Sequence, residues 1–343
     1  MEPKRRVTLK DVAARAGVST AVVSYVINKG PRPTSKEVTE RVHRAVEELD
    51  YHPNHAARGL RARRTHAIAI ATYDFRPSTS FFSHYLGVML AAMTEALHSK
   101  GYYLLLLPFA IDSSPARLRQ LLGEGRVDAI AMRFVTDPPS SDSVLQVIAE
   151  AGLPCVCLER PGAARFGFPS VTYDDREGGR LAMEHLLGRG HRRIAHIHGD
   201  MRYASAQARL SSYERAMTAA GLEIDHSLIV GSPWDMKAAH EATQRLLALD
   251  HPPSAIFAAS DDLALGAVQA IEHRGLSVPG DIAVVGFDDI PISEQMIPSL
   301  STVRLPLEDM GRRVADLLTA ETASHDGPRD VLLPVELIVR ETS

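Results

Sequence analysis

Short apolar runs alternate with longer amphipathic stretches along most of this 343-residue chain, and this alternation constrains the fold more than any other feature. A first series of apolar runs comprises Ile68–Tyr73, Tyr103–Leu107, Val127–Met132 and Pro154–Leu158. A second comprises Ser170–Tyr173, Ile194–Ile197, Leu228–Val230, Ala255–Ala258 and Ile282–Val285. Helical segments lie between the runs, as parallel strands require, so we expect two α/β lobes with helices on both faces of each sheet. Such sheets bind ligands beyond the carboxyl ends of their strands, which predicts a ligand site between the lobes.

The charge is unevenly distributed along the chain. Residues 1–64 contain 14 Lys and Arg against 7 Asp and Glu, whereas the remaining residues contain 24 against 35. A small basic head on a large acidic body is typical of a nucleic-acid-binding module joined to a second domain. A solvated charged face would give the same charge balance. The pattern of residues in the head must therefore distinguish a nucleic-acid-binding module from such a face.

The head shows the signals of three short helices. Thr8 and Asp11 form a capping box, Gly17 supplies a turn, and Ser19 caps a second helix. Ser35 begins a third helix. This spacing predicts a helix-turn-helix, whose second helix enters the major groove. The outward face of that helix carries small, uncharged residues, which suit close approach to base edges better than they suit a structural three-helix bundle without a ligand.

Two segments, Val7 to Asn28 and Tyr51 to Leu60, resemble the LacI/GalR family of bacterial transcription regulators, and the similarity continues to the C-terminus. The resemblance implies an all-α helix-turn-helix domain at 1–50, a hinge helix and linker at 51–65, and an effector-binding and dimerisation domain at 66–343. By the same resemblance, this last domain is expected to be α/β and two-lobed, like a periplasmic binding protein. Its implied bounds are about 66–160 and 292–325 for the N-lobe, and about 168–288 and 330–343 for the C-lobe. The chain would then cross between the lobes near 160–168, 288–292 and 325–330, with a helix at Pro306–Ala320 in the N-lobe and a last strand, Val331–Val339, in the C-lobe.

The resemblance also implies how the head meets DNA. Pro53 to Leu60 becomes a hinge helix that orders in the minor groove, with Leu60 as an intercalating wedge; a plain linker is the alternative. Tyr25 stands where the family often has arginine, so the family's contacts to DNA bases cannot be assigned to this sequence in detail. Ser19, Ser24 and Asn28 are expected to contact the phosphate backbone and so to position the head on the duplex. The candidate DNA contacts are Thr8, Ser19, Thr20, Ala21, Ser24, Tyr25, Asn28, Asn54, Ala57 and Leu60.

The candidate ligand contacts combine carboxylates, a guanidinium group and aromatic rings, as recognition of a sugar requires. They are Tyr73, Phe81, Phe82, Asp174, Arg209, Trp234, Ser260 and Asp288. By resemblance, Arg209 grips ligand oxygens and Trp234 stacks on the ligand; without the resemblance, Trp234 would be assigned to the core. Asp174 has helix capping as its alternative role, and Ser260 stands where many relatives have asparagine. The same residue types would also suit a purine base.

Other kinds of site receive little support from the sequence. His185, His191, His196 and His198 lack a completing ligand at zinc spacing, so we expect no metal, and no motif indicates a cofactor or catalysis. Cys155 and Cys157 do not indicate a disulfide framework. The segment after Met1 is not a secretory signal and no apolar run is long enough for a membrane span, which favours a cytoplasmic, nucleoid-associated protein.

The sequence therefore predicts a DNA-binding transcription regulator, a repressor, controlled by a small-molecule effector that we expect to be a sugar. The alternatives are the same regulator with a nucleobase corepressor, or a sugar- or nucleotide-processing enzyme. We expect a homodimer, because the sequence ends at Ser343 without the leucine-heptad segment that tetramerises some relatives, and a pseudo-palindromic double-stranded operator as its partner. Whether the effector releases DNA or promotes binding is left open.

Overall fold

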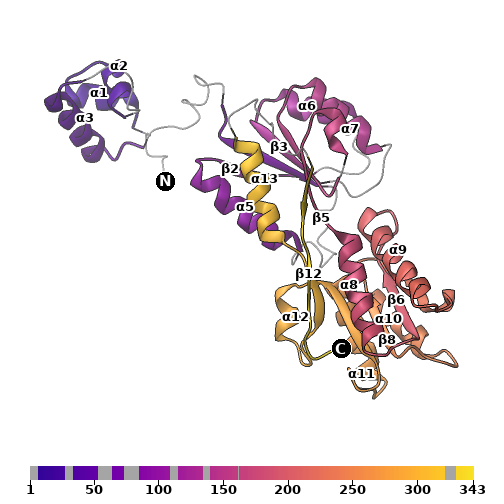
Figure 1. Ribbon diagram of the computed structural model, residues 1–343. Helices are drawn as coiled ribbons and strands as arrows, with labels where there is room; N and C mark the ends of the chain where they lie inside the picture. Colours follow the sequence, from indigo (N-terminus) through magenta and orange to yellow (C-terminus); the bar gives the residue numbers. More distant parts are fainter. Residues whose placement is uncertain are drawn as a thin grey trace. The chain divides into compact units, whose positions relative to one another are not determined.

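The computed structural model describes residues 7–27, 34–52, 64–72, 85–108, 115–133, 140–160, 162–320 and 330–343. Contacts divide the chain into two compact units between Thr65 and His66. The first unit is a small helical head, and the second is a larger α/β body (Figure 1). Each unit has a hydrophobic core of its own.

The head consists of helices α1 (Leu9–Ala16), α2 (Thr20–Ile27) and α3 (Lys36–Glu48). The predicted capping box is present, because the Thr8 side chain accepts from the Asp11 amide while the Asp11 carboxylate accepts from the Thr8 amide at 2.8 Å. Gly17 ends α1 in the left-handed conformation, with φ 64°, which glycine adopts without steric cost. The apolar side of α2 packs against α1 and α3, so that Val12, Val23 and Val42 are fully buried.

The N-lobe of the body is a six-stranded sheet with the strand order β11-β5-β4-β3-β1-β2. Its strands are β1 (Ala67–Thr72), β2 (Tyr103–Pro108), β3 (Ala129–Arg133), β4 (Cys155–Leu158), β5 (Ser170–Tyr173) and β11 (Asp330–Leu333), and all pairings are parallel. One face buries Ile68 and Ile70 against α5 (Gly87–Ser99) and α13 (Leu307–Thr319), which lie side by side in Figure 1. The opposite face buries Ala69 and Ala71 together with residues of α6 (Pro115–Gly123) and α7 (Ser140–Glu150).

The C-lobe repeats this arrangement with the strand order β12-β10-β9-β8-β6-β7. Its strands are β6 (Ile194–His198), β7 (Ile229–Gly231), β8 (Ala255–Ala258), β9 (Ala283–Asp288), β10 (Ser301–Arg304) and β12 (Glu336–Ile338), and only β12 is antiparallel to its neighbour. The helices are α8 (Asp175–Gly188), α9 (Ala204–Ala219), α10 (Met236–Leu247), α11 (Asp261–His273) and α12 (Pro291–Gln295), with short 3-10 turns η2 (Ala163–Phe166) and η3 (His226–Leu228). The predicted two-lobed α/β architecture is thus present.

The first crossing between the lobes lies later than predicted. Ser170–Tyr173 was expected to begin the C-lobe, but β5 pairs with β4 in the N-lobe sheet, with Cys157 opposite Ser170. Tyr173 is buried in that lobe, and its hydroxyl lies 2.9 Å from the hydroxyl of Tyr85. The chain therefore leaves the N-lobe after Tyr173, because β5 forms its backbone hydrogen bonds with β4 in the N-lobe sheet.

The second crossing is also displaced. It was predicted near 288–292, but α12 and β10 remain in the C-lobe, where β10 pairs in parallel with β9. The buried Asp261 carboxylate holds this segment to α11 by accepting from the Ile290 amide at 2.9 Å and from the hydroxyls of Ser293 and Thr302. The crossing therefore lies at Leu305–Pro306.

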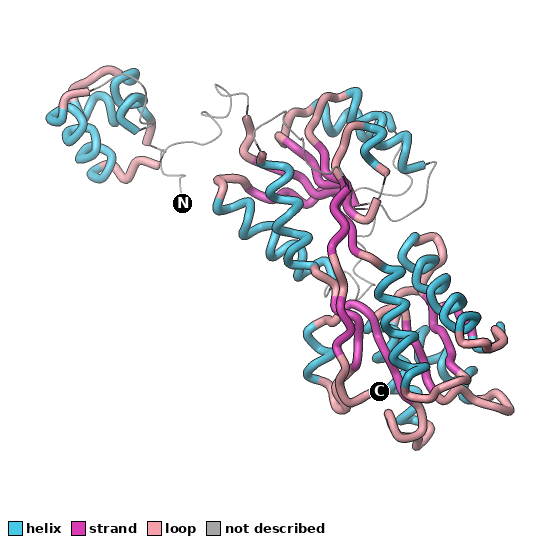
Figure 2. Tube along the Cα trace, viewed as in Figure 1, coloured by secondary structure: helices cyan, strands magenta, loops and turns pink. Residues whose placement is uncertain are grey.

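The single last strand predicted at Val331–Val339 is two strands in the structure. β11 pairs in parallel with β5 in the N-lobe, and β12 pairs antiparallel with β10 in the C-lobe, so the third crossing lies at Pro334–Val335 rather than at 325–330. Pro334 separates the two strands because it has no amide hydrogen to donate to a ladder. Figure 2 shows these strands passing from one sheet to the other.

Candidate functional site

The outward face of α2 holds four of the candidate DNA contacts. Thr20 and Ala21 are exposed, whereas Ser24 and Tyr25 are partly buried. Ser19 precedes the helix and its Oγ accepts from the Val22 amide at 3.3 Å, so this serine caps α2. The start of α2 thus presents small, exposed side chains to solvent.

Four of the candidate DNA contacts in the head are exposed, but several predicted contacts are not tested. Asn28, Asn54, Ala57 and Leu60 lie outside the described residues, as do the candidate cleft aromatics Tyr73, Phe81 and Phe82. Thr8 is exposed, and its side chain takes part in the α1 capping box. The DNA-contact assignments therefore stay predictions.

Arg209 is the centre of the charged cluster in the C-lobe. It projects from α9, is 3% exposed, and its Nε donates to Asp175 Oδ1 at 2.8 Å. Its Nη1 donates to the Ala259 carbonyl and lies 3.8 Å from Asp288 Oδ1. The guanidinium carbon also lies 3.6 Å from the centre of the Phe287 ring, a cation–π contact. The surroundings therefore fix a buried planar cation beyond the carboxyl ends of β8 and β9.

Asp288 ends β9 in an unusual backbone conformation, with φ 122°. Its side chain is 5% exposed, and burial raises the pKa of its carboxyl well above the ordinary value. Arg209 acts in the opposite direction, while Asp261, Asp262 and Asp175 raise the pKa further. Asp288 is thus a crowded carboxyl group that gains from any ligand able to donate hydrogen bonds to it.

At the start of α8, the structure brings Asp175 rather than Asp174 to Arg209. Asp174 Oδ1 accepts from the Glu177 amide at 2.9 Å, so Asp174 is the N-cap of α8, the alternative that the sequence left open. Asp175 Oδ1 also lies 2.7 Å from Arg209 Nη2. The sequence reasoning missed Asp175 because Asp174 and Asp175 are the same residue type at adjacent positions. Only the backbone at the start of α8 decides which of the two side chains points toward Arg209.

Ser260 is likewise a capping residue. It is 1% exposed, and its Oγ accepts from the Leu263 amide at 3.3 Å at the start of α11. The next residue, Asp261, is fully buried, and burial raises its pKa to about 7 although its hydrogen bonds from Ser293 and Thr302 lower it. This end of α11 therefore carries buried acidic groups beside Asp288.

Trp234 lies in the core cluster of the C-lobe and is 7% exposed. Its ring meets the Tyr203 ring edge-on, with 5.7 Å between centroids. It also covers Gly199, where an added Cβ would come within 2.3 Å of the indole. Gly199 directly follows β6, so the indole lies at the same carboxyl edge of the sheet as Arg209. Both interpretations of Trp234, core and ligand contact, are compatible with this position.

The sequence reasoning also missed a charged cluster in the N-lobe. Arg133, at the end of β3, is 1% exposed, and its Nε and Nη2 donate to the two oxygens of Glu159 at 2.9 and 3.0 Å. The Tyr85 hydroxyl donates to Glu159 at 2.5 Å and contacts Tyr173. Arg133, Glu159 and Tyr173 each stand at or just after the carboxyl end of a strand, and this placement is the signal that would have identified them.

Charges of the two lobes act on one another. Glu159 of the N-lobe raises the pKa of Asp175, while Arg209 of the C-lobe lowers the pKa of Tyr173, although burial has the largest influence on both groups. The two clusters therefore both lie near the first crossing, where Tyr173 of the N-lobe and Asp175 of the C-lobe are two residues apart. Alternating carboxylate and guanidinium groups in such a region are suited to binding neighbouring hydroxyls of one ligand.

The four histidines each have a separate structural partner. His196 stacks between Tyr213 and Phe257, His185 contacts Ser343 Oγ at 2.9 Å, His191 contacts Ser254 Oγ at 3.0 Å, and His198 Nδ1 lies 2.7 Å from the Gly199 carbonyl. Within the described ranges, no group of three or more His, Cys, Asp or Glu side chains is placed to hold a metal ion. In the same ranges, no helix has the length and apolar character needed to span a bilayer.

Two parts of the sequence match known families. Residues 8–54 match "Bacterial regulatory proteins, lacI family", and residues 183–343 match "Periplasmic binding protein-like domain". The HTH-type transcriptional regulator CelR of Thermobifida fusca is 36% identical over 347 aligned residues, which cover all of both chains. The HTH-type transcriptional repressor PurR of Erwinia tasmaniensis is 33% identical and covers 91% of this chain and 89% of its own length.

Solved structures agree with these matches over nearly the whole chain. A CelR–cellobiose complex has a TM-score of 0.70 at 32% identity and covers 98% of this chain and 100% of its own. A lac repressor dimer bound to operator and the anti-inducer ONPF has a TM-score of 0.85 at 28% identity, with 98% and 99% coverage. These relatives bear regulator names, and two of their structures contain a sugar or an operator.

Proposed function

Because the chain belongs to the lacI family of bacterial regulatory proteins, we propose that it represses transcription by binding an operator as a homodimer, and that a sugar bound between its lobes controls this binding. The observation that carries the proposal is the buried Arg209, held by Asp175 and Asp288, together with the Arg133–Glu159 pair at the strand ends of the N-lobe. Such a site binds a small ligand through both lobes and so links ligand binding to lobe geometry.

A sugar fits these clusters better than a nucleobase. Each sugar hydroxyl both donates and accepts, and each cluster offers a carboxylate and a guanidinium group side by side. Trp234 lies at the same edge and supplies an apolar face of the kind that sugar rings contact. Support also comes from the solved relative that contains cellobiose. A nucleobase corepressor is the second candidate, because an indole and an arginine also suit a purine.

Titration of the single tryptophan with ligands tests the proposed effector class. We expect cellobiose, rather than hypoxanthine or guanine, to change Trp234 fluorescence and to raise the melting temperature, because binding to the folded state alone stabilises it. The same sugar should alter the affinity for a duplex selected by the protein from a random-sequence pool. A response to the nucleobases alone would favour the corepressor, and conversion of cellobiose during incubation would favour the enzyme.

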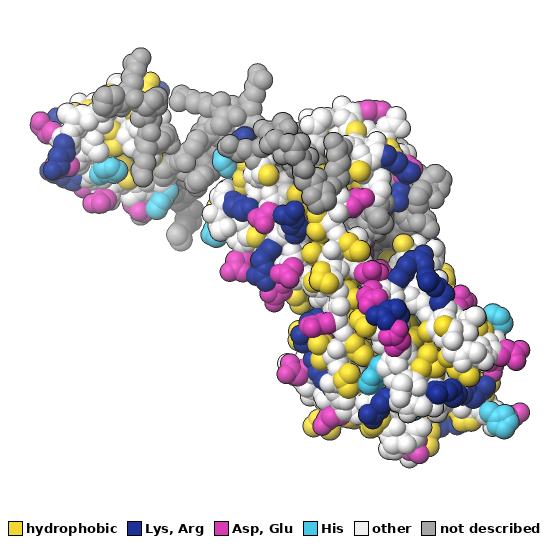
Figure 3. Space-filling view, in the orientation of Figure 1, with side chains coloured by type: hydrophobic (Ala, Val, Ile, Leu, Met, Phe, Trp, Pro, Cys, Tyr) yellow, Lys and Arg dark blue, Asp and Glu magenta, His cyan; other side chains and the backbone are white. Residues whose placement is uncertain are grey.

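The head supplies the operator contacts in this proposal. Its described outward face is formed by Thr20 and Ala21, and two heads in a dimer would read half-sites about one helical turn apart. On the face of the body drawn in Figure 3, acidic and basic side chains are interspersed, which gives no single basic patch there. Since the proposed target is chromosomal DNA, we assign the protein to the cytoplasm, with the nucleoid as its site of action.

Replacement of Leu60 with alanine tests the hinge assignment, which lies outside the described residues. We expect the affinity for the selected duplex to fall at least about tenfold, because the wedge that keeps the bent duplex unstacked is lost. The affinity for cellobiose should stay within about twofold. Leu332→Ala, at a leucine of β11 that is 59% exposed, is the matched control. Equal losses of duplex and sugar affinity would disprove the hinge role.

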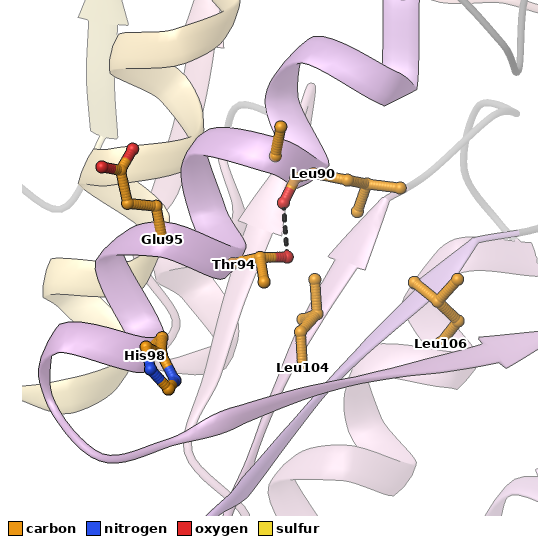
Figure 4. A pocket seen from close by; sticks show the side chains of 7 residues that line it. Leu90, Thr94, Glu95, His98, Leu104 and Leu106 are labelled. Atoms are coloured by element: carbon orange, nitrogen blue, oxygen red, sulfur yellow. Dashed lines mark hydrogen bonds between the residues drawn. The ribbon is translucent and has the colours of Figure 1, made fainter.

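The N-lobe carries a surface suited to a second copy of the chain. β2 is an edge strand, yet Tyr103, Leu105 and Leu106 are 62%, 41% and 46% exposed. Beside it lies a hollow of about 580 Å³ between β2 and α5 (Figure 4), lined by Leu90, Ala91, Thr94, Glu95, His98, Leu104 and Leu106. An exposed apolar edge strand is an aggregation hazard unless it is covered. The solved operator complex of the lac repressor, named as a dimer, supports a second copy as the cover.

Leu106→Asp tests this dimer surface. We expect the dimer dissociation constant to rise at least about tenfold, because burying a carboxylate without a partner is costly. Analytical ultracentrifugation at several concentrations measures the constant, and Leu332→Asp serves as a control on a different exposed strand position. An unchanged dimer in Leu106→Asp would place the interface elsewhere.

A further inference from the structure

The residue after Asp288 occupies an unusual position. Asp288 and Asp289 both have positive φ angles, 122° and 56°, a region that side-chain-bearing residues adopt only where contacts hold them. Asp289 contributes such contacts, since its side chain is only 7% exposed and both of its oxygens are engaged by arginines. The turn that aims Asp288 at Arg209 is therefore held by the next side chain.

The two arginines come from separate segments of the C-lobe. Arg304 Nε lies 2.6 Å from Asp289 Oδ2, and Arg340 Nη1 lies 2.7 Å from Asp289 Oδ1. Arg304 also pairs with Glu336 at 2.8 Å, and Arg340 Nη1 donates to the Leu300 carbonyl at 2.8 Å. We call Asp289, Arg304, Arg340 and Glu336 the crossover cluster.

The crossover cluster lies at the C-lobe ends of two of the three crossings. Arg304 is the last residue of β10 and precedes the crossing at Leu305–Pro306, while Glu336 begins β12 directly after the crossing at Pro334–Val335. The Leu305 amide donates to the Asp288 carbonyl at 3.3 Å, so the second crossing is also tied to the ligand-site residue through its backbone.

A hollow adjoins the crossover cluster and reaches the N-lobe. It has a volume of about 350 Å³, and its walls include Asp289 and Arg304 of the C-lobe together with Val88 of α5 and Arg312 of α13. The hollow is also lined by Leu305 and Pro306, so both lobes and the second crossing contribute to its walls.

We propose that Asp289 is a positioning residue that couples effector contact at Asp288 to the geometry of the second and third crossings. This proposal rests on the proposed function. A displacement of the β9 end on ligand binding moves a carboxylate to which both crossing segments are fixed. One lobe therefore rotates against the other instead of the loop absorbing the displacement. In this proposal Asp289 acts on Arg209 through its neighbour Asp288, which lies 3.8 Å from the guanidinium group.

The test compares Asp289→Asn with Asp225→Asn, a control that removes an aspartate–arginine pair of the C-lobe at Arg193, remote from the crossings in sequence. The probes are cellobiose and the duplex selected from a random pool. For Asp289→Asn we expect the ratio of duplex affinities with and without cellobiose to move toward one by at least about fivefold. Each of these two duplex affinities should stay within about threefold of the wild-type value. An unchanged ratio overturns the proposal, because it would show that the Asp289 pair stabilises the fold without affecting how cellobiose changes duplex affinity.

A second arm does not depend on the effector. Amide hydrogen exchange at Leu305 and Arg340 should be at least about tenfold faster in Asp289→Asn than in wild type or Asp225→Asn. If wild type does not respond to cellobiose, the proposed effector fails, and the exchange arm still decides: equal rates overturn the role of Asp289. Arg304→Gln, at a side chain 47% exposed, repeats both arms with little risk to folding.

Discussion

Arg209→Met is expected to abolish the effector response and to lower the free energy of unfolding by about 3–5 kcal/mol. The reason is that Asp175 and Asp288 would both lose their buried cation, while the Ala259 carbonyl would lose its donor. Arg209 lowers the pKa of both carboxyls against the effect of burial, so its loss removes the interaction that favours their charged forms. Urea unfolding at pH 7 measures the stability, and duplex binding with and without cellobiose measures the response.

Two further variants test whether the charge, the planar shape or the buried location of Arg209 causes these effects. Arg209→Lys keeps a cation but not the planar fork, so we expect partial recovery of stability and little recovery of the effector response. Arg193→Met removes a half-exposed arginine that pairs with Asp225, and should cost less than about 1 kcal/mol. A normal effector response in Arg209→Met would show that the ligand binds elsewhere.

The second large effect concerns pH and Asp261. Its pKa in the folded protein is about 7, above the value of roughly 3.9 for an exposed aspartate, so between these pH values the native state holds a proton that the unfolded state has released. The stability from this group is therefore fully present below about pH 4 and is lost as the pH rises through 7. Between pH 5 and pH 8 the expected loss is on the order of 3 kcal/mol, at about 1.4 kcal/mol per pH unit up to pH 7, and urea unfolding at these pH values measures it.

Asp261→Asn should flatten this pH dependence. The asparagine oxygen retains the position that accepts from the Ile290 amide and Ser293, and its amide group can donate to the Thr302 hydroxyl, which reverses its role. Asp225→Asn is the control, since hydrogen bonds from Ser227 and Arg193 lower the pKa of Asp225 to about 2 and place its titration below the measured range. If wild type and Asp261→Asn lose equal stability between pH 5 and pH 8, Asp261 is not the group responsible.

Much of the candidate site was predictable because it depends on residue type near a strand end. Arg209 and Asp288 were identified in advance, and the structure brings them within 3.8 Å of each other. Asp174 and Ser260 were also named, but both side chains cap helices. Arg133 and Glu159 escaped notice because nothing local distinguishes a buried ion pair from two solvated charges until β3 and β4 lie side by side.

The sequence by itself determined the helical head, the alternation of strands and helices, and the division into two lobes. Caps and hydrophobic periodicity act between residues a few positions apart, so Thr8, Gly17 and Ser35 mark helix ends without reference to the rest of the chain. Only the tertiary structure decided which sheet receives β5, β10 and β11, and hence where the chain crosses between the lobes. The physical reason is that a strand joins the sheet in which its hydrogen bonds and both of its faces are satisfied, and those partners are distant in sequence.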